Sequence, residues 1–398
     1  MAYTFNTTPN LAIGEGSIKQ LGNILGRLGI TKPFIITGPN ISKTNILTEV
    51  QKHSWTPNAA VYNRVKAEPP VGCIYEAVEM AVSHNADGII ALGGGSPLDV
   101  AKLVAILADK NDTWFGKRKL NSMFGVGNVV NDGLPVVAIP TTAGSGSEVT
   151  PVAIFTTGDK QKMGVVSPKI IPNAAILEPS FTVSCSPKLT AYSAIDAMIH
   201  AIESYTSVSP NNNPYSKMLA LEACKYLGKS TKTAILEPEN LQARADVQYG
   251  SMLAGQAFAN SPVAAVHALA YPIGANFGLA HGLTNTLVMP AVFKYNQCPE
   301  YADICTAMFP HDEGEIIYQY RRTEWNGGNM EKVAEVLVRN ILHIADVAEI
   351  RIDMSHYGIT AKDCEKMASQ VMNQTRLLVN NPREITEEIA EQLYLEVL

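Results

Sequence analysis

Residues 247–293 contain no aspartate, glutamate, lysine or arginine, and this uncharged segment constrains the fold more than any other part of the chain. So long an apolar run belongs either in a lipid bilayer or in the interior of a protein. Pro262, Pro272, Gly274, Gly278 and two histidines interrupt it, which argues against a membrane-spanning helix. We therefore expect a buried protein interior and no membrane partner.

The pattern of apolar residues changes along the chain. Up to about Pro179, short β-branched runs alternate with helical stretches, which is the pattern of a parallel sheet covered by helices. The runs are PFIITG, NAAVYN, DGIIALGGG, LPVVAIPTT and NAAILEP. After about Pro187 nearly every segment is helical. Because 398 residues exceed one ordinary core, the sequence predicts an α/β domain over residues 1–185, an all-α domain over residues 186–398, and a functional site in the cleft between them.

Composition excludes some classes of function. The formal net charge is −6, whereas nucleic-acid-binding proteins usually carry a basic patch, so no nucleic-acid partner is expected. Six cysteines are scattered without C-x-x-C spacing, which is typical of reduced core residues in a cytoplasmic protein. The first residues lack a basic region followed by an apolar run, so no signal peptide is expected.

A glycine-rich segment, DGIIALGGGSPLDVAK, predicts a phosphate-binding turn. An apolar strand from Gly88 to Leu92 precedes three glycines, and Ser96, Pro97 and Asp99 match the N-cap, the first-turn proline and the third position of a capping box. Glycines allow close approach of a ligand, and the free amides of a helix N-terminus attract a pyrophosphate. The alternative is a tight turn that needs glycine only for its backbone angles.

A second segment, IPTTAGSGSEVT, follows the predicted strand Val136 to Ile139. It offers hydroxyl groups from threonine and serine and free amides from glycine. Alone it is an ordinary polar loop. In a doubly wound sheet, however, the loops at the carboxyl ends of neighbouring strands converge on one crevice, so the two segments together predict a dinucleotide site.

The segment AYSAIDAMIHAIESYTS, residues 191–207, predicts a helix that is apolar on nearly every side yet carries Asp196 and His200. Residues four apart lie on one helix face, with Cβ atoms roughly 5–6 Å apart. A carboxylate removed from water needs a partner, because burial of an unpaired charge is costly.

His267 and His281 lie in the uncharged segment and are the candidate partners. Pro272, Gly274 and Gly278 make one continuous helix between them improbable, so the chain can turn and bring both imidazoles to one point. With Asp196 and His200 they form a set of three nitrogens and one carboxylate that suits a divalent metal. The alternative is that Asp196 and His200 form only a local hydrogen bond.

Four segments, GGGSPLDVAK, PTTAGSGSEVT, AIDAMIHAIESYTS and AVHALAYPIGANFGLAHGLTNTLVMP, together resemble the iron-containing alcohol dehydrogenase family, including its lactaldehyde:propanediol oxidoreductase and butanol dehydrogenase types. The resemblance extends to NNPREITEEI near the C-terminus. It implies a Rossmann-like α/β domain followed by an all-α domain, the architecture of dehydroquinate synthase, and commonly a homodimer. It also implies that Asp196, His200, His267 and His281 bind a metal, usually Fe(II), with Zn(II) as the alternative.

The same resemblance implies a set of cofactor-binding residues and one departure from the family. Many relatives carry a histidine four residues after the third metal ligand, where this chain has Tyr271, so a proton relay here would use a tyrosine hydroxyl or water. The residues that would line the nucleotide site are Gly94, Gly95, Ser96, Asp99, Thr141, Thr142, Ser145 and Lys162.

The segment FIITGPNISKTN bears on the choice of cofactor, with Gly38 and Asn40 as candidate contacts. In dinucleotide folds an acidic residue near the end of an early strand accepts the ribose hydroxyl of NAD and repels the 2′-phosphate of NADP. Relatives that prefer NAD often carry aspartate where this chain has Gly38, and Lys43 is close enough in sequence to reach a phosphate. We therefore predict that NADP(H) is accepted.

The sequence thus predicts a metal-dependent oxidoreductase that transfers a hydride between NAD(P)(H) and a small alcohol or aldehyde. Phe258, Val263, Tyr271 and Phe277 would suit a short aliphatic substrate. A dehydroquinate synthase would need basic residues that the metal-bearing segments lack, and a maleylacetate reductase would lack the metal ligands. A glycerol dehydrogenase-like metal and NAD enzyme, or a non-catalytic nucleotide-binding protein, stays open as an alternative.

Overall fold

The computed structural model describes residues 2–108, 117–157, 162–310 and 327–398. The chain divides into two compact units. One unit is Asn6–Ser184, and the other is Cys185–Leu398 together with the residues up to Phe5.

The unit Asn6–Ser184 is built on a six-stranded sheet in which every neighbouring pair is parallel, in the order β1-β9-β6-β4-β2-β3. Five of its strands are the five predicted runs, because each run is apolar, β-branched and bounded by turn residues. The sixth, β1, was not predicted. The strands are β1 (Leu11–Ile13), β2 (Pro33–Ile36), β3 (Ala60–Tyr62), β4 (Gly88–Gly93), β6 (Val136–Pro140) and β9 (Ala174–Leu177).

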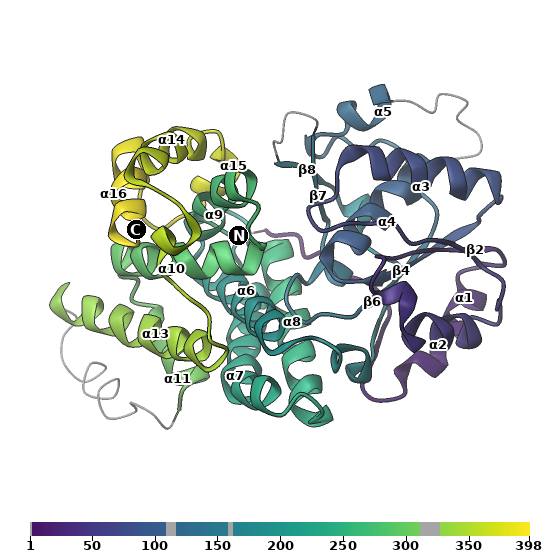
Figure 1. Ribbon diagram of the computed structural model, residues 1–398, viewed down its shortest axis with the longest axis horizontal. Helices are drawn as coiled ribbons and strands as arrows, with labels where there is room; N and C mark the ends of the chain where they lie inside the picture. Colours follow the sequence, from purple (N-terminus) through teal and green to yellow (C-terminus); the bar gives the residue numbers. More distant parts are fainter. Residues whose placement is uncertain (1, 109–116, 158–161, 311–326) are drawn as a thin grey trace. The chain divides into compact units, whose positions relative to one another are not determined.

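Helices cover both faces of this sheet (Figure 1). Ile35, Ile90 and Val137 pack with residues of α1 and α2 in one core, whereas the alternate residues Phe34 and Ile89 are buried outside that core. This alternation follows from the two-residue period of a strand. The helices of this unit are α1 (Leu21–Arg27), α2 (Asn45–His53), α3 (Val71–Ser83), α4 (Gly95–Leu107) and α5 (Lys117–Ser122).

A second, three-stranded sheet in the order β5-β8-β7 was not predicted. Its strands are β5 (Gly125–Val126), β7 (Val152–Thr156) and β8 (Lys162–Val166). Strands β7 and β8 are antiparallel, with Ile154 opposite Gly164. Strand β5 has two residues and β7 and β8 have five each, and the period of such short runs is ambiguous in the sequence.

The described part of Cys185–Leu398 is helical and contains no β-strand. The predicted α/β and all-α fold class is therefore confirmed. Helix starts follow the capping rules: Ser186 accepts from the Leu189 amide before α6, and Asn213 and Ser216 form a capping box before α7. The helices are α6 (Pro187–Thr206), α7 (Pro214–Leu236), α8 (Leu241–Asn260), α9 (Ala265–Phe277), α10 (His281–Asn296), α11 (Tyr301–Met308), α13 (Gly327–Val347), α14 (Ala361–Val371), α15 (Thr375–Leu378) and α16 (Glu387–Glu396).

The uncharged segment forms most of α8, all of α9 and most of α10. Most of its apolar side chains are buried, and Val266, Leu269 and Leu287 are among those that are almost or fully inaccessible to solvent, as the lack of charge predicts. Across the ranges that the structure describes, none of the helices has both the length and the apolar character required to cross a bilayer.

Candidate functional site

Helix α6 carries two polar residues on a buried face. Asp196 is 6% exposed and His200 is 5% exposed, while Ile195, Met198 and Ile199 around them are fully buried. One helical turn separates the pair, and the Asp196 Oδ1 atom lies 3.9 Å from His200 Nε2. The predicted pairing on one face is present, and the carboxylate is buried as expected.

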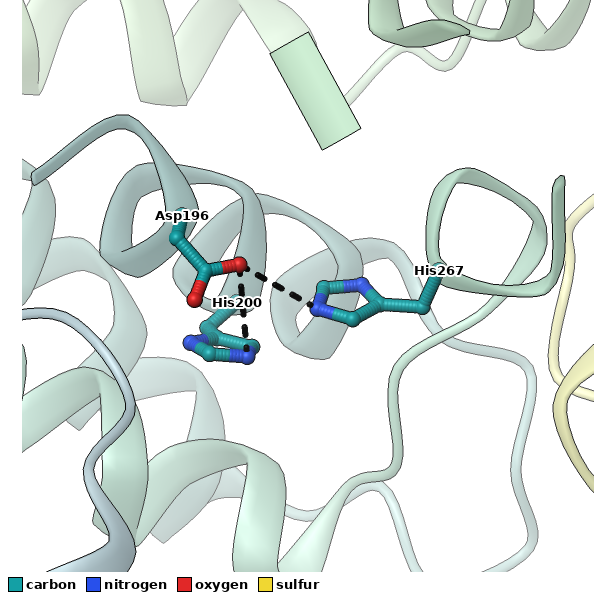
Figure 2. A group of neighbouring side chains, drawn as sticks. All are labelled: Asp196, His200 and His267. Carbon is teal, nitrogen blue, oxygen red and sulfur yellow. Dashed lines mark ion pairs between the residues drawn. The ribbon is translucent and has the colours of Figure 1, made fainter. Parts of the chain in front are cut away.

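His267 and His281 are brought to the same carboxylate. His267 Nε2 lies 3.6 Å from Asp196 Oδ1, and His281 Nε2 lies 3.8 Å from it. Figure 2 shows the Asp196 carboxylate facing the ring nitrogens of His200 and His267. The predicted turn between the two histidines is confirmed. It falls at Gly278, whose left-handed φ of 68° ends α9, while Pro272 and Gly274 lie inside that helix.

Aromatic rings pack around this cluster. The rings of His200 and His267 are stacked with centroids 4.7 Å apart, and Phe258 stacks on the other side of His200 at 4.4 Å. Tyr271 lies beside His281, with ring centroids 5.8 Å apart. These contacts restrict the orientations of the imidazoles. His200 and His267 are shielded from water, whereas the His281 side chain is 31% exposed.

Asp196, His200 and His267 each offer a ligand atom, and these three atoms lie within 4.8 Å of one another, as a shared metal ion requires. His281 is not part of that group of three, although its Nε2 atom lies 3.8 Å from Asp196 Oδ1. Ligand atoms that share a tetrahedral cation at ~2.1 Å lie roughly 3.4 Å apart, close to the 3.6–3.9 Å that separate Asp196 Oδ1 from the three imidazole nitrogens. A single amide, Asn285 Nδ2, faces three of these atoms: it donates to Asp196 Oδ1 at 2.6 Å and lies 3.3 Å from His267 Nε2 and His281 Nε2. These three acceptor atoms outnumber the two N–H donors of the Asn285 amide, and a bound cation would satisfy the lone pairs that the amide leaves without a partner.

The electrostatics of the cluster favour positive charge. Burial raises the pKa of Asp196, but the neighbouring His200, His281 and His267 outweigh burial and hold that pKa well below its usual range. Burial lowers the pKa of His267, yet hydrogen bonds with Asp196 and Glu203 raise it to about 9. Both shifts arise from the attraction between the buried carboxylates and the imidazoles beside them.

Sequence reasoning missed two residues of this cluster, Glu203 and Asn285. Glu203 is 3% exposed and follows His200 by three residues, so it lies on the same side of α6. Asn285 is fully buried and follows His281 by four residues on α10. The available signal was the same helical spacing that identified Asp196 and His200.

The two predicted phosphate loops lie against each other within the unit Asn6–Ser184. A Cβ atom on Gly94 would lie 3.2 Å from Thr142 Oγ1, and one on Gly95 would lie 3.0 Å from Ser145 Cβ. The Thr141 amide donates to the Gly93 carbonyl at 2.9 Å. The structure therefore brings Gly94, Gly95, Thr141, Thr142 and Ser145 together, as the convergence of strand ends predicts.

The predicted capping box at Ser96 and Asp99 is wrong. Helix α4 begins at Gly95, its N-cap is the extended residue Gly94, and no side chain caps it. Ser96 therefore lies inside the first turn. The Asp99 carboxylate instead accepts hydrogen bonds from Ser147 Oγ and from the Ile154 amide at 2.9 Å. Ser147 lies in the second loop and Ile154 lies in strand β7. Because both donate to the Asp99 carboxylate, that carboxylate does not cap the first turn of α4.

A buried lysine, Lys102, also joins this region, and sequence reasoning did not identify it. Lys102 Nζ donates to Ser147 Oγ at 2.8 Å, Thr150 Oγ1 at 3.2 Å and the Val152 carbonyl at 2.8 Å. It lies 3.7 Å from Asp99 Oδ1. Burial lowers the pKa of Lys102 to about 8. The ammonium group links α4 to the second loop from inside the unit.

The remaining candidate cofactor residues lie on other elements. Lys162, on β8, pairs with Glu68 at 2.9 Å. Gly38 follows β2, and its carbonyl accepts from the Ser42 amide at 3.2 Å. Asn40 is exposed, and its side chain makes no capping hydrogen bond to the short 3₁₀ helix that follows it.

Known proteins resemble this chain over nearly its full length. It is 34% identical over 389 residues to long-chain-alcohol dehydrogenase 1 of Geobacillus thermodenitrificans, covering 96% of this chain and 93% of that protein. It is 32% identical over 295 residues to the NAD-dependent methanol dehydrogenase of Bacillus methanolicus, covering 73% and 75% of the two proteins. The solved alcohol dehydrogenase from Oenococcus oeni superposes with a TM-score of 0.88 and 27% identity over 100% of both chains.

Both halves of the chain match the same family. Residues 8–179 match the family described as iron-containing alcohol dehydrogenase, and residues 190–398 match the C-terminal part described for the Fe-containing alcohol dehydrogenase family. These matches decide against the alternative of a non-catalytic nucleotide-binding protein. The protein is an enzyme, a metal-dependent oxidoreductase, and it belongs to the iron-containing alcohol dehydrogenase family.

Proposed function

We propose that Asp196, His200, His267 and His281 bind Fe(II), or Zn(II) in its place, and that this metal centre acts on a small alcohol or aldehyde. The observation that carries the proposal is the convergence of three imidazole Nε2 atoms to within 3.6–3.9 Å of one buried carboxylate oxygen. When bound, such a cation supplies the positive charge that favours loss of the hydroxyl proton of an alcohol and polarises an aldehyde carbonyl. The protein supplies the orientation of the four ligands and a site shielded from water.

The second cofactor in the proposal is NAD(P), bound by the two glycine-rich loops. Gly94 and Gly95 let the backbone approach a pyrophosphate at the N-terminus of α4, where free amides point outward. Thr141, Thr142 and Ser145 add hydroxyl groups beside these glycines. Ser96, Asp99, Lys162, Gly38 and Asn40 are the further proposed cofactor residues. A bound nicotinamide accepts or supplies the hydride.

The proposed substrate is a short aliphatic alcohol or diol and its aldehyde. Phe258 and Tyr271 place two large rings beside the ligand histidines, and this limits the space for a long chain. The relatives named above act on methanol and on long-chain alcohols, so substrate size varies among similar proteins.

A panel of substrates tests the proposed activity. The purified protein, reconstituted anaerobically with Fe(II), should oxidise short primary alcohols or diols and reduce the matching aldehydes. The readout is NAD(P)H absorbance with NAD and NADP tested separately, and metal content is measured on the same sample. The absence of any absorbance change with every short-chain aldehyde, in protein that holds a full metal equivalent, would contradict the proposal.

We also propose that the protein is a homodimer. Strand β1 is at the edge of the six-stranded sheet, and its side chains Leu11 and Ile13 are 36% and 46% exposed. An unpaired strand edge with apolar side chains is a surface on which another chain can pair. Light scattering of the purified protein measures the mass, and a monomeric mass at micromolar concentration would contradict this proposal.

The proposed location is the cytoplasm, and the proposed domain limits are residues 1–185 and 186–398. The six cysteines are free thiols, which supports a reducing compartment. The division of the chain between Ser184 and Cys185 supports the domain limits. Limited proteolysis tests these limits, because cleavage near residue 185 should yield two protected fragments.

A further inference from the structure

The buried carboxylate of Glu203 accepts two hydrogen bonds from consecutive residues of α9. Its Oε1 atom accepts from the Val266 amide at 2.7 Å, and its Oε2 atom lies 2.6 Å from His267 Nδ1. Glu203 lies on α6, the helix that also carries Asp196 and His200 (Figure 1). One helix therefore provides two of the candidate metal ligands and holds a third.

Helix α9 has no cap of its own, and Glu203 takes that place. The N-cap residue is Ala264, which has no side-chain acceptor, and no local side chain bonds to the first turn. The first amides of a helix lack partners within the helix and favour a negative charge nearby. The Glu203 carboxylate satisfies the Val266 amide and places its charge at this helix start. The position of His267, in the same turn, depends on this contact.

We propose that Glu203 is a positioning residue that sets the tautomer and orientation of His267 for metal binding. This inference rests on the proposed metal centre. When the Nδ1–H group of His267 donates to Glu203, the proton is held on Nδ1 and the Nε2 atom keeps its lone pair for a metal. This Nε2 atom lies 3.6 Å from Asp196 Oδ1. Metal-binding histidines commonly use a carboxylate in this way, and loss of that carboxylate typically weakens metal affinity 10–100-fold.

A carboxylate is required because both of its oxygens act as acceptors. Glutamine has nearly the same shape but offers one acceptor and one donor. In a Glu203→Gln protein the amide NH₂ must face either the Val266 amide or the His267 ring. In the second case the imidazole accepts at Nδ1 and carries its proton on Nε2, which blocks the lone pair that a metal needs. The substitution thus changes the hydrogen-bond pattern with almost no change in volume.

Metal titration of the full-length protein tests the inference. Glu203→Gln should weaken Co(II) and Zn(II) binding about 10–100-fold, measured by competition with a chromophoric chelator, and should change the visible Co(II) spectrum. Ser204→Ala is the matched control, because its neighbouring hydroxyl is buried and has no hydrogen-bond partner among the described residues. Circular dichroism confirms that each variant is folded at the titration temperature. A wild-type Kd and Co(II) spectrum for folded Glu203→Gln would overturn the inference.

His267→Ala separates this inference from the proposed metal centre. That variant should lose most bound metal but keep nucleotide binding, because the two glycine loops belong to the unit Asn6–Ser184. A full metal equivalent in His267→Ala would contradict the metal centre itself. In the His267→Ala background, Glu203→Gln should change the remaining affinity by less than about twofold, because the positioning effect acts through the imidazole. A similar loss in both backgrounds would contradict a role through His267.

Discussion

Gly38 is the second residue after strand β2, and this single position bears on the choice between NAD and NADP. A Cβ atom on Gly38 would lie 3.1 Å from the Val65 carbonyl oxygen, so a side chain fits after a shift of a few tenths of an ångström. Gly38→Asp should move the kcat/KM ratio toward NAD by about tenfold or more, because a carboxylate repels the 2′-phosphate of NADP. Gly38→Ala adds the Cβ without the charge and is the control. A wild-type enzyme that strongly selects NAD, with no change in the aspartate variant, would contradict a role for this position.

Tyr271 allows a second prediction at the residue scale. Its ring lies 5.8 Å from that of His281, and it follows His267 by one helical turn. If its hydroxyl carries the alcohol proton toward solvent, Tyr271→Phe should lower kcat at least about tenfold while metal content and nucleotide affinity stay constant. Tyr271→His should recover most of the rate. An unchanged kcat in the phenylalanine variant would assign the relay to water.

Part of the candidate site was predictable from a local signal. Asp196 and His200 lie four residues apart in an apolar helix, so helical spacing alone identifies them. Glu203 has the same kind of spacing, but its two donors stand 63 and 64 residues further along the chain. Ser96 matched a capping pattern, yet Gly94 became the cap because the Asp99 carboxylate binds Ser147 and Ile154 instead. Competition from distant donors is not visible in a local pattern.

At the scale of elements, the close approach of α6 and α10 places His281 at the cluster. A Cβ atom on Gly282 would lie 2.2 Å from the backbone oxygen of Tyr192, so only glycine permits this approach. Gly282→Ala should push α10 away from α6, lower stability by about 1–3 kcal/mol and weaken metal binding. Thermal unfolding and chelator competition measure both effects.

Gly72→Ala is the control for this prediction. It lies in α3, where a new Cβ meets nothing within 4 Å, so alanine should be neutral or slightly stabilising there. Normal metal affinity in a folded Gly282→Ala protein would show that α10 tolerates the shift.

Five strands of the larger sheet were predicted, and the strands of the smaller sheet were not. Strands β4 and β6 stand out because each is an unbroken apolar run bounded by turn residues. Strand β5 has two residues, and β7 alternates only over Val152–Thr156, so neither exceeds the background of apolar residues in loops. A break in the helix between His267 and His281 was predicted. Its position was not, because it is set by Gly278, which ends α9 in the left-handed conformation.

At the scale of the whole molecule, buried charge makes stability depend on pH. Burial raises the pKa of Glu148 from 4.5 to about 7, in spite of the nearby Lys102. A raised pKa favours the protonated form in the folded state, so the contribution of Glu148 to stability is complete below pH 4.5 and is lost as the pH rises to about 7. Glu148→Gln should remove this loss of stability, which amounts to roughly 1.4 kcal/mol per pH unit at most.

Urea unfolding at pH 5, 6 and 7 measures the effect of Glu148→Gln. Hydrogen exchange of peptides from α4 reports on the unit that contains Glu148. We expect the wild-type midpoint to fall across this range and the midpoint of the variant to fall less. Equal slopes for the two proteins would show that the Glu148 carboxyl titrates at its usual pH.

Asp196, His200 and Glu203 all stand on α6, four and three residues apart. An insertion of one residue between them would rotate the following side chains by ~100° and separate the carboxylate from its two donors. The number of residues in this part of the chain is therefore fixed, whereas loops elsewhere can lengthen without disturbing the cluster. Among descendants of such a chain, insertions and deletions should accumulate in the connections and be absent between positions 196 and 203.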